Sequence, residues 1–487
     1  MALAQRAGMG RFTVLAVRLS VVAAMASGCT SSRPVGRPVP APPSASDATT
    51  GHNVATATLS VGGATGVTVG DRPVALSLET SLLDSPAVSG ADPSLVALVR
   101  ALRPAFLRVG ASSGDETTPS VAGLDRLAAL AAATGVPVVL GLPLASYAPI
   151  DSAGLVASAQ RRLGRLLIAV EIGNEPDTYI ARRFRRAGWS YPDYRRQVMA
   201  YLSALRATAP HLPVWGPDTS TSSWLAEVAG QRPSPLAVLT AHYYPLSACN
   251  GHQPTVGQLL SLLTARAERT AAQGFLEAAG RLGVPAVIGE GNSVACGGEA
   301  TVSDRAAAAF WAADEALLMS TAGVTATAFH VGMSGCTGYN PFCLNATGRA
   351  ARHTGSTAPW RATPEYAGMQ VGSLLAGGHV LDATLAAPGH DVRAYAARMP
   401  DGTRRVLLFN LDPPATAPLT VPHSSLLRGA RSAAVTTVLA STDYSQARLT
   451  QGHASAGTTA AAIVNSVIQP GQALTLRPGT IVQLTLH

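Results

Sequence analysis

Short apolar runs alternate with longer helix-like stretches through residues 74–331 of this 487-residue chain. The stretches between the runs are rich in Ala and Leu, as in LDRLAALAAATG at 124–135. Continuous apolar runs separated by helices are typical of strands buried in a parallel sheet. The eight runs cover residues 74–80, 104–111, 137–144, 166–174, 213–218, 238–245, 285–292 and 324–331. Eight such units predict a (β/α)8 barrel, which we expect over residues 73–355.

Polar residues gather at the C-terminal ends of these runs. A doubly wound sheet is the alternative fold, but no Gly-rich dinucleotide fingerprint follows the first run. Barrel enzymes place their active sites at the C-terminal ends of the strands. This distribution therefore favours the barrel. The polar strand ends are Glu79, Arg108, Asn174, Glu175, Asp218, His242, Tyr243, Tyr244, Glu290 and His330, of which His242 is more often a satisfied barrel histidine than a catalyst.

The pattern changes after residue 365. One helix-like segment, EYAGMQVGSLLAGG, is followed by strands that alternate apolar and polar residues and are separated by turn sequences such as Pro-Asp-Gly. We predict an antiparallel β-sandwich domain over 356–487. Strand-like segments at 53–61 and 66–70 precede the barrel. We expect residues 51–72 to join this sandwich, so that both ends of the chain build it.

The N-terminus has the features of an export signal. Basic residues precede a short apolar stretch, and small residues lead to Cys29. This pattern predicts a lipoprotein-type signal peptide at 1–29, with Cys29 acylated as the only membrane anchor; simple secretion is the alternative. Residues 30–50 are rich in Pro, Ser and Ala, which is typical of a tether. An exported, cell-surface location follows from this interpretation.

Charge and cysteine content narrow the class of protein. The net charge is +8, and all 36 basic residues are arginines. They are scattered along the chain, which argues against nucleic acid as a partner and favours a solvated basic surface.

Four cysteines follow Cys29, and an even number in an exported chain favours disulfides. Three pairings are possible; we favour the short loop Cys336–Cys343 together with Cys249–Cys296. No CxxC or His spacing supports a zinc site, and we expect no metal and no cofactor.

Two carboxylates carry the candidate chemistry. The fourth run ends in Asn174-Glu175-Pro176, and the seventh ends in Gly289-Glu290-Gly291. In a closed eight-stranded barrel these two ends face each other across the mouth. A pair of carboxylates held there suits glycosidic cleavage, in which one protonates the leaving oxygen and the other attacks the anomeric carbon or activates water. We therefore predict a carbohydrate as the substrate.

This arrangement resembles the clan of retaining glycosidases that carry catalytic glutamates on barrel strands four and seven. The loops FLRVGASSGDE (106–116), EGNS (290–293) and GMSGCTGYNPF (332–342) further resemble glycoside hydrolase family 79, the bacterial and fungal β-glucuronidases and the heparanases. The resemblance implies that Glu175 is the acid/base, that Glu290 is the nucleophile and that Asn174 binds the sugar 2-hydroxyl. It implies an exo-acting enzyme that removes terminal β-linked glucuronic acid.

The same resemblance implies further sugar ligands. Tyr339 corresponds to a loop position that holds the uronate, and packing within the loop is its alternative role. Glu79 and Asp115 match carboxylates that accept sugar hydroxyls; their alternatives are an ion pair with Arg108 and helix capping. Either Tyr243 or Tyr244 is expected to orient the nucleophile. We expect Arg108 to form a structural ion pair rather than to bind the uronate.

Two other functions remain open at this stage. An endo-acting, heparanase-like enzyme would cut a uronic-acid polysaccharide, although the loops after the strands hold few arginines to line such a cleft. A surface lipoprotein that binds glycans without cleaving them is the second alternative. Barrels of that kind usually lose one of the two carboxylates, whereas both are present here.

Overall fold

The computed structural model describes residues 55–231, 234–332, 336–344, 360–426, 430–450, 465–469 and 471–487. The signal peptide (1–29), the acylation of Cys29 and the tether (30–50) lie outside these residues and stay predictions. Within the described ranges, no helix combines the length and the apolar character that crossing a bilayer requires.

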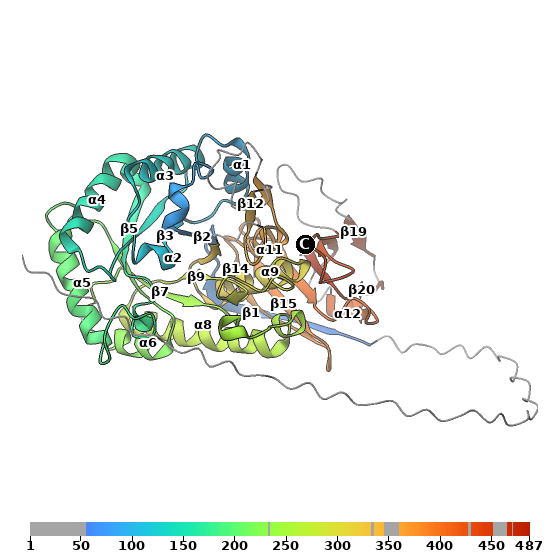
Figure 1. Ribbon diagram of the computed structural model, residues 1–487. Helices are drawn as coiled ribbons and strands as arrows, with labels where there is room; N and C mark the ends of the chain where they lie inside the picture. The colour runs from blue at the N-terminus through green and yellow to red at the C-terminus, as the bar shows by residue number, and fades with distance from the viewer. Residues whose placement is uncertain are drawn as a thin grey trace, which may run out of the picture. The chain divides into compact units, whose positions relative to one another are not determined.

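Eight parallel strands close into a barrel, in the order β11-β2-β3-β4-β5-β6-β7-β9 (Figure 1). Each strand coincides with one of the apolar runs, and most of their residues are buried because helices cover the outside while side chains fill the inside. The strands are β2 (Val74–Glu79), β3 (Leu107–Gly110), β4 (Val138–Leu142), β5 (Leu167–Ile172), β6 (Val214–Thr219), β7 (Val238–Tyr243), β9 (Ala286–Gly291) and β11 (Thr327–Val331).

The helices around the barrel begin and end at recognisable signals. Asp92 caps α1 by accepting hydrogen bonds from the N–H groups of Ser94 and Leu95, and Gly135 and Gly283 end α3 and α8 in the left-handed conformation. The helices are α1 (Pro93–Leu102), α2 (Ala111–Gly114), α3 (Val121–Thr134), α4 (Pro149–Leu163), α5 (Tyr191–Leu205), α6 (Ser222–Ala229), α7 (Val256–Leu259), α8 (Leu262–Leu282) and α9 (Ala306–Ala322), with 3-10 turns η1 (Thr80–Asp84), η2 (Gly164–Leu166), η3 (Pro176–Thr178) and η4 (Cys249–Gly251).

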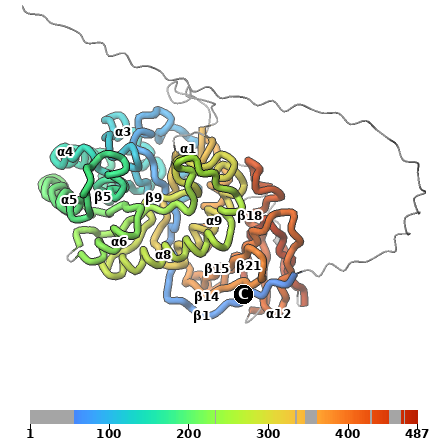
Figure 2. Tube along the Cα trace, turned by 60° about the horizontal axis from the view of Figure 1, so that its bottom comes forward, coloured from blue at the N-terminus to red at the C-terminus, as the bar shows by residue number. Residues whose placement is uncertain are grey.

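A second domain is antiparallel and takes its first strand from the N-terminal side of the barrel, as predicted. Its seven-stranded sheet has the order β1-β14-β15-β16-β21-β18-β19, and the small β17–β20 pair contributes to the same apolar core. In both views the blue β1 lies beside β14 (Figures 1 and 2). The strands are β1 (Thr58–Thr68), β14 (His379–Ala386), β15 (Val392–Arg398), β16 (Arg404–Asn410), β17 (Leu419–Val421), β18 (Ala433–Ala440), β19 (Asn465–Ile468), β20 (Leu474–Leu476) and β21 (Thr480–Leu486), with α12 (His423–Leu426) beside them.

The two N-terminal segments predicted as separate strands form the single strand β1. Its pairing with β14 shifts register after Val61 and again after Ala64, around the glycines of this segment. Such irregularities bend a strand without ending it.

Helix α9 links the two domains. Its residues 306–320 are all buried, because α9 contacts β11, α11 (Pro364–Gly372) and β15 on different sides. Gly368 lets α11 approach closely, since a Cβ atom there would lie 2.1 Å from the Ala309 carbonyl oxygen. The Tyr395 hydroxyl on β15 donates a hydrogen bond to Asp314 of α9 at 2.6 Å.

Two disulfides and two short strand pairs order the loops above the barrel. Cys249 is bonded to Cys296, and Cys336 is bonded to Cys343, which are the pairings favoured from sequence. The first bond lies beside the pairing of β8 (Leu246–Ser247) with β10 (Val294–Ala295). The second lies beside the pairing of β12 (Phe342–Leu344) with β13 (Trp360–Ala362).

Candidate active site

Glu175 is held in an unusual backbone conformation just beyond β5. Gly173 has a φ of +83°, and a Cβ there would lie within 3 Å of Leu144 and Tyr179, so this turn requires glycine. Glu175 itself is left-handed, with φ 48° and ψ 54°, and Pro176 then begins η3. The Glu175 N–H donates a hydrogen bond to the Asp218 carbonyl at 3.0 Å. The turn thus directs the Glu175 side chain to the barrel mouth, where 23% of it is exposed.

Glu290 lies at the end of β9 in a more enclosed position. Its Oε1 accepts a hydrogen bond from the Tyr244 hydroxyl at 2.8 Å, and its Oε2 accepts one from Arg108 Nη1 at 2.9 Å. His330 Nδ1 lies 3.3 Å from the same Oε2. Burial raises the pKa of Glu290, but the charges of His330, His242 and Arg108 outweigh it and hold the pKa well below its usual value. Glu290 is therefore ionised at neutral pH.

The two glutamates face each other across the mouth. One oxygen of Glu175, one of Glu290 and one nitrogen of His242 all lie within 4.8 Å of one another. The carboxyl groups of retaining glycosidases are about 5–5.5 Å apart, whereas those of inverting enzymes are about 6.5–9.5 Å apart. Two carboxylate oxygens that approach within 4.8 Å favour the shorter range, in which a carboxylate reaches the anomeric carbon directly.

The same three residues also have the composition of a metal site, but both nitrogens of His242 already face carboxylates. Its Nδ1 lies 3.1 Å from Glu175 Oε1, and its Nε2 lies 3.5 Å from Asp218 Oδ1. Burial opposes the charged ring, but the charge of Glu290 and the hydrogen bonds to Asp218 and Glu175 raise the pKa of His242 to about 10. A protonated imidazole has no lone pair for a metal ion and serves as a donor to carboxylates.

Arg108 organises the floor of the site. Its guanidinium is buried, and each of its nitrogens contacts a protein group. The distance is 2.6 Å from Nε to Glu171 Oε2 and 2.9 Å from Nη1 to Glu290 Oε2. The planar fork of an arginine suits several fixed acceptors at once. The groups that it contacts are Ser77, Glu171, Asn174, Asp218 and Glu290. Arg108 thus forms ion pairs within the barrel, as expected, and its donors are occupied by protein groups.

Glu171 and Asp218 both contact Arg108, and their pKa values are shifted in opposite directions. Burial and the neighbouring Asp218 charge raise the pKa of Glu171 to about 8. Burial also favours the neutral form of Asp218, but the charges of Arg108 and His242 hold its pKa below the usual value. One carboxyl of the pair is therefore protonated at neutral pH and the other is charged, which limits the negative charge near Glu290.

The amide oxygen of Asn174 is engaged in a hydrogen bond, whereas its amide nitrogen is available. Its Oδ1 accepts a hydrogen bond from Arg108 Nη2 at 2.9 Å, which fixes the orientation of the amide. Its buried Nδ2 has no hydrogen-bond partner among the described residues. An oriented donor of this kind is suited to a substrate hydroxyl.

Asp115 does not have the position expected for a sugar ligand. Its side chain is fully buried and accepts hydrogen bonds from the Asn174 N–H at 3.1 Å and from the Tyr179 hydroxyl. Arg182 Nη1 lies 3.2 Å from its other oxygen. This placement does not fit direct contact with a sugar, because protein groups enclose the carboxylate; it fits a residue that supports the Asn174 backbone.

Glu79 is half-buried at the end of β2 and does not pair with Arg108. Its Oε2 accepts a hydrogen bond from the Ser113 N–H at 2.8 Å, and its Oε1 lies 3.6 Å from His330 Nε2. His330 thus lies between Glu79 and Glu290. Burial opposes the charged ring, but the Glu290 and Glu79 charges raise the pKa of His330.

Tyr339 is brought beside the glutamates by the loop after β11. Its ring centroid lies 6.0 Å from that of Tyr244 and 5.4 Å from that of His330. Burial and the Glu290 charge raise the pKa of Tyr339, so its hydroxyl keeps its proton. Tyr339 therefore lies beside two side chains that themselves contact Glu290.

The two tyrosines after His242 have different surroundings. Tyr244 donates its hydroxyl to Glu290, whereas Tyr243 is on the side of β7 that faces the helices. The pKa of Tyr243 is raised by burial and by Glu268 and Glu315, which belong to α8 and α9. Of the two candidates, Tyr244 is the one that contacts Glu290.

Sequence reasoning did not assign site roles to several residues that complete this network. In the sequence Asp218 is a polar residue at a strand end, and Glu171 is a single charged residue in an apolar run. His242 is likewise a polar strand end in the sequence, and in the structure it contacts Glu175 at 3.1 Å. The available signal was the presence of charged residues inside otherwise apolar strands, since a buried charge requires a partner.

Comparisons with known proteins agree with the barrel-and-sandwich fold. No protein-family model matches the chain, and no curated protein matches it by sequence. A crystal structure of a 4-O-α-L-rhamnosyl-β-D-glucuronidase from Fusarium oxysporum 12S, in a Rha-GlcA complex, is 20% identical with a TM-score of 0.64, covering 88% of this chain and 100% of that one. A family 51 arabinofuranosidase from Xanthomonas axonopodis pv. citri is 14% identical with a TM-score of 0.63, covering 89% and 100%.

A bifunctional glucanase-xylanase from a metagenome library is 14% identical with a TM-score of 0.59, covering 88% of this chain and 99% of that one. The names of all three proteins describe enzymes that cleave glycosides. Because these identities are low, the matches establish a shared fold.

Proposed function

We propose that the protein is a retaining glycoside hydrolase that removes terminal β-linked glucuronic acid. The observation that carries this proposal is the placement of Glu175 and Glu290 at the ends of the fourth and seventh barrel strands, with carboxylate oxygens within 4.8 Å. The names of the three structural neighbours support glycosidic cleavage, and the Fusarium protein is itself named as a glucuronidase.

In the first step Glu290 attacks the anomeric carbon while Glu175 donates its proton to the glycosidic oxygen. The bond from the anomeric carbon to that oxygen breaks, and the leaving group departs as an alcohol. Glu290 suits the attacking role because its low pKa keeps it ionised. Tyr244 and Arg108 hold one oxygen each, which fixes the orientation of the carboxylate.

In the second step Glu175, now a carboxylate, takes a proton from water, and the resulting hydroxide attacks the glycosyl ester on Glu290. This releases the sugar with its original configuration and regenerates both side chains. Glu175 suits the acid/base role because it is the more exposed of the two glutamates and can meet both the leaving group and water. The free Asn174 Nδ2 is a suitable donor to the sugar 2-hydroxyl.

The proposal also requires a group that binds the carboxylate of the glucuronic acid. Arg108 is saturated by protein acceptors, so it cannot bind the substrate carboxylate as well. Tyr339 keeps its proton and lies beside His330. We assign to its hydroxyl a hydrogen bond to the uronate. Glu79 remains available to accept a hydrogen bond from a second sugar hydroxyl through Oε1.

We further propose that the protein is exported and anchored through an acylated Cys29. The two disulfides support this part, since structural disulfides form in oxidising compartments. Mass spectrometry of membrane-extracted protein tests it. A diacylglyceryl adduct on Cys29 is expected, and an unmodified N-terminus at another residue would contradict it.

The test of the proposed activity is hydrolysis of p-nitrophenyl β-glucuronide beside the matching β-glucoside, β-galactoside, β-xyloside and α-arabinofuranoside, with Glu290→Gln as the control. We expect release from the glucuronide alone, abolished in the control. Release from a neutral glycoside or from the arabinofuranoside instead would retain the two glutamates and refute the uronate assignment. An endo-acting enzyme would release oligosaccharides from a uronic-acid polysaccharide, so monosaccharide as the only product excludes it.

A further inference from the structure

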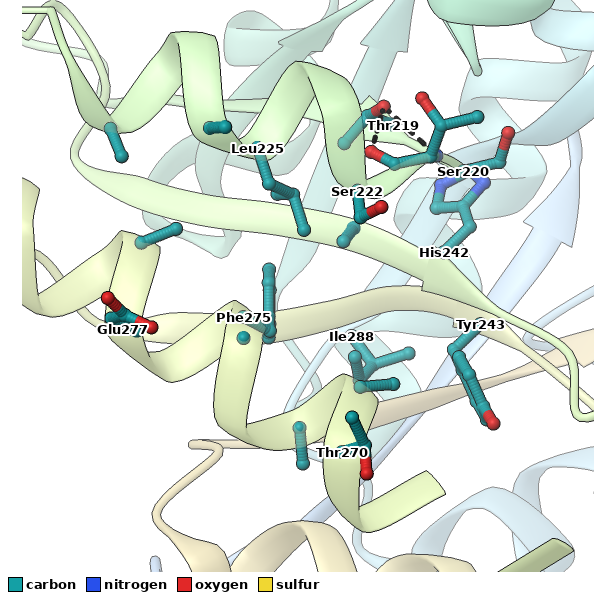
Figure 3. A pocket seen from close by; sticks show the side chains of 18 of the residues that line it. Thr219, Ser220, Ser222, Leu225, His242, Tyr243, Thr270, Phe275, Glu277 and Ile288 are labelled. Carbon is teal, nitrogen blue, oxygen red and sulfur yellow. Dashed lines mark hydrogen bonds between the residues drawn. The ribbon is translucent and has the colours of Figure 1, made fainter. Parts of the chain in front are cut away.

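A groove of about 780 Å³ runs between helices α6 and α8 on the outer side of the barrel wall (Figure 3). Its base consists of the buried apolar side chains of Ile288, Phe275 and Met319. Its sides include the small residues Ala226 of α6 and Ala271 of α8. The volume lies within the range of about 300–1,000 Å³ that is typical of small-molecule pockets.

One end of this groove lies next to His242. Thr219, Ser220 and His242 line it there, and Figure 3 shows the His242 imidazole beside Ser220. The Nδ1 atom of this imidazole is 3.1 Å from Glu175 Oε1. The Ser220 N–H donates a hydrogen bond to Asp177, two residues beyond Glu175, at 3.1 Å. The groove therefore begins one side chain away from Glu175, the residue that protonates the leaving group in the proposed reaction.

The chemistry of the lining changes along the groove. Hydroxyl groups surround the end beside Ser220, and the charged pair Glu277 and Arg281 lies at the far end of α8. Between these ends the described lining residues are uncharged and mostly apolar. The distance along α8 from Ala267 to Ala278 is about 16 Å at a rise of 1.5 Å per residue. A polysaccharide would find few polar partners over this length, whereas a hydrocarbon chain would be removed from water.

We infer that this groove binds the leaving group of the substrate and that this leaving group is an elongated alkyl chain. The inference rests on the proposed function, since Glu175 must be the acid for the leaving group to start at Ser220 and His242. The preferred substrate is then an amphipathic glycoside whose sugar enters the barrel mouth and whose chain lies between α6 and α8.

The test compares methyl, butyl and octyl β-glucuronides, all below the concentration at which micelles form. We expect kcat/KM to rise with chain length, by about tenfold or more from methyl to octyl. Ala226→Trp fills the groove from an exposed position on α6 and should lower the octyl-to-methyl ratio of kcat/KM about tenfold. Ser223→Trp, which is exposed on the same helix but outside the groove, should leave this ratio unchanged.

A kcat/KM that is independent of chain length, or an equal fall of the ratio in both variants, would overturn the inference. Calorimetry with the non-hydrolysable octyl and methyl thio-β-glucuronides separates this result from a failure of the proposed activity. Tighter binding of the octyl compound, reduced by Ala226→Trp, would support the groove even in the absence of turnover. Equal affinity for the two compounds would refute the groove while leaving the proposed hydrolysis intact.

Discussion

Tyr244 donates its phenolic hydrogen to Oε1 of Glu290 at 2.8 Å, while its neighbour Tyr243 points to the opposite side of β7. Adjacent residues of a strand point to opposite faces, so only one of two consecutive tyrosines can reach the barrel interior. Of the two tyrosines, only Tyr244 therefore helps to orient Glu290, and Arg108 holds the other oxygen of that carboxylate.

Tyr244→Phe should therefore lower kcat. A hydrogen bond to a charged group contributes about 1.5–3 kcal/mol, which corresponds to a loss of about tenfold to hundredfold. Tyr243→Phe removes the same hydroxyl from the helix-facing side and should change kcat by less than about threefold. Steady-state kinetics on an aryl glucuronide makes the comparison. Equal losses in the two variants would contradict the role of Tyr244.

Arg108→Lys should affect both activity and pH dependence. A lysine cannot satisfy the acceptors that the buried guanidinium now bonds, and breaking a buried charge pair costs about 3–5 kcal/mol of stability. The pKa of Glu290 should also rise, because the charge 2.9 Å away is displaced. The acid limb of the kcat/KM profile, which reports ionisation of the nucleophile, should then move to higher pH.

The control for Arg108→Lys is Arg126→Lys. Arg126 makes a long, partly exposed ion pair with Asp84 at 4.0 Å and donates one hydrogen bond to the Leu83 carbonyl at 2.7 Å, so the change should cost about 1 kcal/mol. An acid limb that stays in place in Arg108→Lys would show that this arginine does not set the pKa of Glu290.

Stability should fall as the pH rises from about 5 to 9. Glu365 is buried and its Oε1 accepts a hydrogen bond from Asn292 at 2.7 Å, but burial raises its pKa to about 8. A carboxyl whose pKa is higher in the folded state than its unfolded value of about 4.3 contributes stability at low pH, and this is lost as the pH rises through 8. The glutamine in Glu365→Gln stays neutral, so the stability of this variant should depend less on pH.

Thermal unfolding at pH 5 and pH 9 tests this expectation. The melting temperature of Glu365→Gln should exceed that of the unchanged protein by about 4 °C or more at pH 9, and differ little at pH 5. The same difference at both pH values would mean that the ionisation of Glu365 does not limit stability.

The two disulfides should differ in their contributions. Loop-closure entropy predicts about 4 kcal/mol for Cys249–Cys296, which spans 47 residues, and about 2 kcal/mol for Cys336–Cys343, which spans 7. Urea unfolding of the two Cys→Ser pairs measures both values. A larger loss from the short loop would show that strain or loop packing, rather than chain entropy, controls their effect.

The barrel was predictable because each strand is a continuous apolar run, and the two glutamates were predictable because Asn-Glu-Pro and Gly-Glu-Gly end two of those runs. The orientation of side chains within the strands was harder to obtain. Alternation along Thr240, His242 and Tyr244 could have identified the inward set, but only once the phase of β7 was known.

The Arg108 network was not accessible from sequence for a different reason. Its members come from five strands, and their contacts depend on the stagger of the barrel, which composition does not reveal. The protein contacts of Asp115 were also not predictable, because a loop carboxylate has no periodicity to show whether it faces substrate or protein.

The most direct test of the central claim is the configuration of the first product. Proton NMR during hydrolysis of p-nitrophenyl β-glucuronide distinguishes the two anomers before they equilibrate. Because the Glu175 and Glu290 carboxylates approach within 4.8 Å, the β anomer should appear first, with the α anomer growing in later. Initial formation of the α anomer would show that water attacks directly and would contradict the assignment of Glu290 as a nucleophile.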